Sequence, residues 1–141
     1  MSTLDLQSAN RIIEGVLSHG RGIKAAPLAV AVIDIGGHLV SLQRQDGASL
    51  LRPQVATGKA WGAIALGKTS RLLAEDSQQR PAFYAALNAL GRGAVVPAPG
   101  GVLIRDESGV VLGAVGVSGD TSDIDEQCAL KGVEAMGFEV G

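Results

Sequence analysis

The spacing of apolar residues predicts a helix near each end of the chain. Residues 4–18 repeat apolar side chains at helical spacing, and Gly20 can end that helix. Residues 123–136 predict the last helix, with Asp123 capping its first turn and Gly137 following its last. Two amphipathic helices of this kind can cover one face of a sheet.

Short apolar runs between these helices predict two β-hairpins. Residues 28–33 form a continuous β-branched run, residues 34–38 read as a turn, and residues 39–44 return. Residues 102–105 and 110–117 repeat the pattern around Asp-Glu-Ser-Gly, and residues 94–96 can add a fifth strand.

Helical segments are predicted between the hairpins, from Pro53 to about Leu66, from Arg71 to Glu75 and from Pro81 to Leu90. Hairpins require antiparallel pairing, so the order of elements predicts an α+β fold. We expect a five-stranded antiparallel sheet, with the terminal helices on one face and the middle helices on the other.

Composition narrows the class of protein. The 141 residues suit one domain, 1–141, and 46% apolar with 18% charged residues is typical of a globular chain. A net charge of −2 without a basic run argues against nucleic acid as a partner, and no apolar stretch is long enough to span a membrane. A lone cysteine, Cys128, and no signal-peptide pattern lead us to expect a cytoplasmic location.

Glycines suggest a concave surface or unusually close packing. The chain has 20 of them, including Gly36-Gly37, Gly100-Gly101 and a glycine-studded run over residues 110–119. A glycine at a strand end lets a ligand or another backbone approach closely. A low charge fraction and a surface of small residues also favour a homo-oligomer, because extra apolar area must be covered.

Four side chains are candidates for acid–base or anion chemistry. Lys59 lies on an apolar helical face, so it requires either an Asp partner or an anionic ligand. Arg44 ends a strand that we interpret as facing inward. Asp34 and His38 could act as acid and base, or could simply order the hairpin turn.

Backbone amides and histidines supply the remaining candidates. The turns at Gly100, Gly101, Ser118 and Gly119 could bind an anion through N–H groups, with Asp123 either contacting the ligand or capping its helix. His19 and His38 are the candidate metal ligands. The alternatives are a helix C-terminal position for His19 and an exposed turn for His38.

Five short motifs, in order and spacing, resemble the GlcG/HbpS family, also known as DUF336. They are V-x-D-x-G-G-x-L at 32–39, R-x-D-G at 44–47, K-A-x-x-A at 59–63, P-G-G at 99–101 and G-A-x-G-V-S-G at 113–119. Asp123 and Ala129 also fall where that family has an acidic residue and an alanine in its last helix.

The resemblance implies a profilin-like three-layer α/β/α fold and homo-oligomers, often octamers. It also implies haem or another tetrapyrrole as ligand, in a setting of small-molecule catabolism. A small-ligand-binding protein is therefore the first hypothesis. A cofactor-independent enzyme acting on a small carboxylate or carbonyl compound, such as an isomerase or lyase, and a structural oligomer subunit remain as alternatives.

Overall fold

The computed structural model describes residues 3–140, which form five helices and five strands. Their order is α1 (Leu6–Gly22), β1 (Ala29–Asp34), β2 (Leu39–Arg44), α2 (Arg52–Leu66), α3 (Ser70–Gln79), α4 (Pro81–Leu90), β3 (Gly101–Arg105), β4 (Val111–Ser118), α5 (Ser122–Ala135) and β5 (Glu139–Val140). Both predicted hairpins are confirmed, as is the α+β class.

The strands form one antiparallel sheet in the order β2-β1-β4-β3-β5. In its centre, β1 pairs with β4 so that Ala29 lies opposite Ser118 and Asp34 opposite Gly113. The Asp34 turn and the Ser118 turn therefore lie at opposite ends of the sheet.

None of the helices between residues 3 and 140 is long and apolar enough to cross a membrane.

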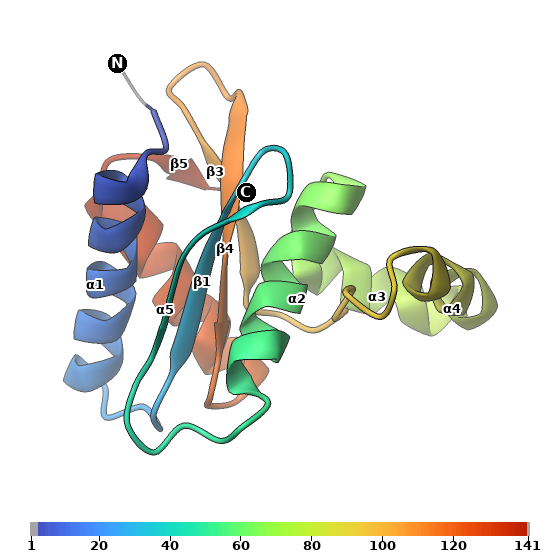
Figure 1. Cartoon of the computed structure of the whole chain (residues 1–141), viewed down its shortest axis with the longest axis horizontal. Helices are drawn as coiled ribbons and strands as arrows, with labels where there is room; N and C mark the ends of the chain where they lie inside the picture. The colour runs from blue at the N-terminus through green and yellow to red at the C-terminus, as the bar shows by residue number, and fades with distance from the viewer. Residues whose placement is uncertain (1–2, 141) are drawn as a thin grey trace.

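Helices cover both faces of the sheet, which confirms the predicted three layers. Helices α1 and α5 pack side by side on one face, while α2 lies across the other and leads into α3 and α4, which extend beyond the sheet (Figure 1). The first face buries large aliphatic side chains such as Ile12 and Val115. The second is built mainly from small ones such as Ala60 and Ala114.

The fifth strand lies elsewhere than predicted. Residues 94–96 form a loop, and the short β5 pairs with β3 instead. The backbone N–H of Val95 donates to Asn88 Oδ1 at 3.2 Å and that of Val96 donates to the Gly58 carbonyl at 3.3 Å. These donors are therefore taken by helical residues, and Val95 packs into a cluster beside α3 and α4.

Three helix boundaries also correct the sequence predictions. Helix α1 does not end at Gly20 but continues to Gly22. Thr121, not Asp123, caps α5, because its Oγ1 accepts from the N–H of Ile124 at 3.3 Å. Asp123 lies within the first turn instead. Helix α3 is longer than the predicted 71–75 segment, since Thr69 caps it and it continues to Gln79.

Candidate functional site

The glycines of β3 and β4 allow α2 to lie directly on the sheet. A Cβ added to Gly116 would lie 1.9 Å from the carbonyl oxygen of Ala56, and one added to Gly101 would lie 2.3 Å from that of Lys59. No side chain fits at such distances without moving the helix. The close approach that the glycines suggested is thus made by the protein's own helix.

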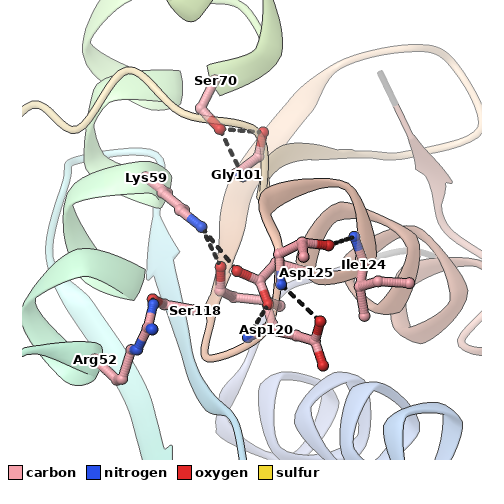
Figure 2. Close-up of polar contacts among 10 residues, drawn as sticks. Arg52, Lys59, Ser70, Gly101, Ser118, Asp120, Ile124 and Asp125 are labelled. Atoms are coloured by element: carbon pink, nitrogen blue, oxygen red, sulfur yellow. Dashed lines mark hydrogen bonds and ion pairs between the residues drawn. The ribbon is translucent and has the colours of Figure 1, made fainter. Parts of the chain in front are cut away.

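Lys59 reaches across the sheet from α2 to a buried carboxylate on α5 (Figure 2). Its Nζ donates to Asp125 Oδ2 at 3.1 Å and to the Val117 carbonyl oxygen at 2.9 Å. The exposed fractions of the two side chains are 3% and 1%. Asp125 Oδ1 also accepts from the N–H of Asp120 at 2.9 Å. The ion-pair alternative for Lys59 therefore holds.

Burial works against both charges of this pair. It lowers the pKa of the Lys59 amine, with the Asp125 carboxylate opposing that shift. Burial also raises the pKa of Asp125, against the donors that surround it. Each charge is held in the interior by the other and by nearby backbone groups. The lysine is thus engaged in a structural contact that ties α2 to α5.

The glycine turns predicted to bind an anion surround Lys59, but Gly101 and Ser118 form their hydrogen bonds within the protein. The N–H of Gly101 donates to Ser70 Oγ at 2.7 Å. Ser118 Oγ accepts from Arg52 Nη1 at 3.2 Å. Gly100 lies against Lys59, where an added Cβ would be 2.8 Å from its Nζ.

Asp34 and His38 order the β1–β2 turn. Asp34 Oδ1 accepts from the N–H groups of Gly36 and His38, each at 2.9 Å. The His38 backbone donor is the main reason that the pKa of Asp34 lies below its usual value. The imidazole is 83% exposed and its Nδ1 lies 3.5 Å from Asp34 Oδ1. The turn-ordering alternative accounts for both residues.

The three candidate catalytic residues do not converge. Lys59 bonds to Val117, close to the β4 end that carries Ser118, whereas Asp34 and His38 lie at the other end of β1. The enzyme hypothesis was motivated by Arg44, Lys59 and the glycine turns lying near one apolar core, with His38 or an Asp as acid or base. The geometry removes that motivation.

His19, His38 and Asp123 lie apart from one another. His19 Nε2 is 3.0 Å from Gln127 Nε2, at the contact between α1 and α5. Asp123 pairs with Arg71 of α3 at the surface. Within residues 3–140, no group of three or more His, Cys, Asp or Glu side chains could hold a metal ion.

A groove of about 620 Å³ lies between the edge strand β2 and helix α2. Aliphatic side chains and the indole of Trp61 form most of its wall, and Arg44 is the one charged residue of its lining. The residues that define it here are Leu42, Arg44, Leu50, Thr57, Gly58 and Trp61. We call this hollow the β2–α2 groove.

Strand register explains the position and shape of this groove. Leu42 lies opposite Ala31 and Arg44 opposite Ala29, and both alanines pack against Ala56 of α2. Leu42 and Arg44 therefore lie on the α2 side of the sheet. Because the three alanines are small, the space between α2 and the edge strand is left open.

The environment of Arg44 differs from the sequence prediction. It was expected at the end of an inward-facing strand, but β2 is an exposed edge strand and Arg44 itself is exposed. Among the described residues, no carboxylate forms an ion pair with its guanidinium. Within residues 3–140, the cation is thus placed at the groove without a carboxylate partner.

Sequence reasoning missed the other groove residues and the partner of Lys59. The chain has a single tryptophan, Trp61, on the same helix as Lys59. The rarity of this residue could have marked its side of the helix as a candidate binding surface. Leu50 lies in an irregular segment that no periodicity describes. Asp125 is the second acidic residue in the first turn of α5. Acidic residues are favoured at a helix N-terminus in any case, so its position did not indicate a partner for Lys59.

Known proteins resemble this chain along nearly its whole length. An uncharacterized 15.0 kDa protein encoded between dhaT and dhaS in Citrobacter freundii is 28% identical over 129 residues, which cover 92% of this chain and 89% of that protein. The corrinoid adenosyltransferase PduO of Citrobacter freundii is 25% identical over 134 residues. That match covers 95% of this chain but only 39% of PduO.

The fold also matches a solved structure, that of a PduOC:heme complex. The TM-score is 0.87, with 23% identity over 98% of each chain, and at that identity the likeness establishes the fold alone. The family model described as "Haem degrading protein HbpS-like" matches residues 4–134. This span includes all of the motifs that suggested the resemblance, and the chain therefore belongs to the HbpS-like family.

Proposed function

We propose that this protein binds a flat, largely apolar small molecule of the tetrapyrrole class in the β2–α2 groove. The observation that carries the proposal is the groove itself, whose volume of about 620 Å³ lies in the range usual for small-molecule sites. Membership of a haem-degrading family and the fold shared with a haem complex support the choice of ligand class.

The groove lining matches the chemistry of a tetrapyrrole's ring and edge. Its macrocycle offers two flat apolar faces, for which Trp61 and Leu42 provide complementary surface. Its carboxylate groups remain charged, and Arg44 is positioned to pair with one of them. A groove open along its length lets the other carboxylates stay in water.

Trp61 provides a direct measurement of binding, because it is the only tryptophan and lies in the wall of the groove. We expect a tetrapyrrole to quench its fluorescence in a saturable way. Leu42→Glu places a charge against the apolar face of the ligand, which should weaken binding by at least about tenfold. Haem and protoporphyrin IX are suitable first ligands.

Gln43→Glu is the matched control, since Gln43 lies on the opposite face of the same strand. It adds the same charge one residue away and should bind like the wild type. If neither ligand quenches Trp61, the proposed function is wrong. Equal losses in both variants would instead show that the ligand binds outside the groove.

We further propose that the protein self-associates through the apolar surface beside this groove. Helix α4 contains no Asp, Glu, Lys, Arg or His, yet only Tyr84 of its ten residues is buried. Leu90 is 82% exposed and Leu50 is 80% exposed. A helix that is apolar on every side is normally covered.

Sedimentation velocity tests the self-association. Leu90→Glu should shift the protein toward monomer, while Val110→Glu, at an exposed apolar site in the distant β3–β4 hairpin, should leave the assembly intact. A wild-type protein that sediments as a monomer at every concentration tested would contradict the proposal.

A further inference from the structure

The donor chemistry of the β2–α2 groove does not match ligation of haem iron. Proteins hold haem iron through His, Cys, Met or Tyr. None of these residue types, and no Lys, lines the groove in the part of the chain that the structure describes. The groove therefore suits the ring of a tetrapyrrole but offers its metal no ligand.

Possible iron ligands elsewhere in the described residues are engaged or lie on the other face. Cys128 is fully buried between α1 and α5, and burial raises the pKa of its thiol to about 11. Met136 packs against that same core. The Tyr84 hydroxyl donates to Asp76 at 3.2 Å. His19 contacts Gln127 on the α1–α5 side.

His38 is the nearest imidazole to the groove, since the neighbouring Gly37 packs against Trp61. Its ring, however, lies beside the Asp34 carboxylate in an exposed turn and is not part of the groove wall. An iron ligand drawn from this turn would have to leave that contact.

Arg44, by contrast, is suited to an anion. It lies on the α2 side of β2, at the groove, and pairs with no carboxylate among the described residues. Asp46 lines the hollow on the other side of Arg44 without forming an ion pair with it. A guanidinium binds a carboxylate through two parallel hydrogen bonds, which fixes orientation as well as charge.

We infer that the groove recognises the macrocycle and a carboxylate of its ligand and is indifferent to the metal. The ligand class is thus an anionic tetrapyrrole, with or without iron. This inference rests on the proposed function and narrows it. Apolar contact supplies affinity, and Arg44 selects ligands that carry an acid group at the ring edge.

Titration of Trp61 fluorescence with three ligands tests this inference: protoporphyrin IX, its iron complex haem, and the dimethyl ester of protoporphyrin IX. We expect the affinities of the first two to agree within about threefold. The ester lacks the charges and should bind about fivefold more weakly, near the upper end of what an exposed ion pair contributes.

Variants of Arg44 separate charge from packing. Arg44→Gln should weaken the two diacids to the level of the ester, and Arg44→Lys should recover much of the loss. Arg11→Gln is the control, because Arg11 is an exposed arginine on α1, across the sheet from the groove. It should match the wild type with all three ligands.

The outcomes distinguish this inference from the proposed function. Haem binding at least about tenfold tighter than protoporphyrin IX, with that advantage lost in His19→Ala or His38→Ala, overturns the inference but keeps tetrapyrrole binding. Diacids and ester that bind equally overturn the role of Arg44. Failure of all three ligands to bind removes the proposed function itself.

Discussion

Replacing Lys59 by methionine should be among the most destabilising single changes available in this protein. The substitution keeps most of the side-chain length but removes the charge that compensates Asp125. The lost contacts are the 3.1 Å ion pair with Asp125 Oδ2 and the 2.9 Å hydrogen bond to the Val117 carbonyl. Asp125 would then keep only backbone donors, including the N–H of Asp120.

The exposures of the two side chains, 3% and 1%, set the size of the effect. Breaking a fully buried pair by removing one partner costs about 3–5 kcal/mol, because an uncompensated charge stays in the interior. A domain of this size has a free energy of unfolding of about 5–15 kcal/mol. Lys59→Met should therefore remove a large share of the stability.

Urea unfolding followed by circular dichroism measures the free energy of unfolding of each variant. The double variant Lys59→Met/Asp125→Leu removes both charges and should recover most of the loss, since apolar replacements of buried pairs are often near neutral. Asp125→Asn is the milder single variant. Because burial already lowers the pKa of Lys59, the amine can release its proton there and limit the cost.

A Lys59→Met variant that loses less than about 1 kcal/mol would refute this reasoning, as would a double variant no more stable than the singles. The first result would mean that the Asp125 carboxylate finds water or another partner once the lysine is removed. The second would mean that the two residues stabilise the fold independently. Ligand binding offers a separate check, because Lys59 does not line the groove. In properly folded variants, the tetrapyrrole should still quench the fluorescence of Trp61.

Three other outcomes follow from the structure. Cys128 is fully buried with a thiol pKa of about 11, so a thiol reagent at pH 8 should label the native protein far more slowly than the urea-unfolded chain, and equal rates would contradict its burial. Backbone donors lower the pKa of Asp120 in the folded protein below 3.8. Between that lowered pKa and 3.8 the unfolded chain binds more protons than the folded protein, so the free energy of unfolding should fall as the pH drops through this range. Asp120→Asn should reduce the slope of that fall in acid titrations of unfolding. Gly116→Ala should lower the free energy of unfolding by about 1–3 kcal/mol, measured in urea, because its Cβ would meet the Ala56 carbonyl at 1.9 Å; an unchanged value would show that α2 can shift without cost.

Local pattern was sufficient for most of the architecture. Alternating and continuous apolar runs, with turn residues between them, placed both hairpins and the two long terminal helices. Turn chemistry also supplied, as one of two alternatives for Asp34, the role in its own turn that the structure shows. An apolar helical face predicted that Lys59 must have a partner. These features depend on residues a few positions apart, which the sequence displays directly.

Contacts between distant segments decided the rest. Asp125 is 66 residues from Lys59, and only the packing of α2 and α5 around β4 brings the two together. The fifth strand lies at residues 139–140 and pairs with β3, whereas the donors of residues 95 and 96 bond to helical groups of α4 and α2. Strand register, rather than periodicity, set Arg44 on the α2 side of an exposed edge.

The sequence by itself determined the elements, their order and the presence of a buried charge. The tertiary structure alone decided where the candidate ligand groove lies. Leu42, Leu50 and Trp61 belong to a strand, an irregular segment and a helix, and they share a wall because three small alanines leave space between β2 and α2. The shape of a groove depends on how separate elements pack together, so it cannot be predicted from any one short stretch of sequence.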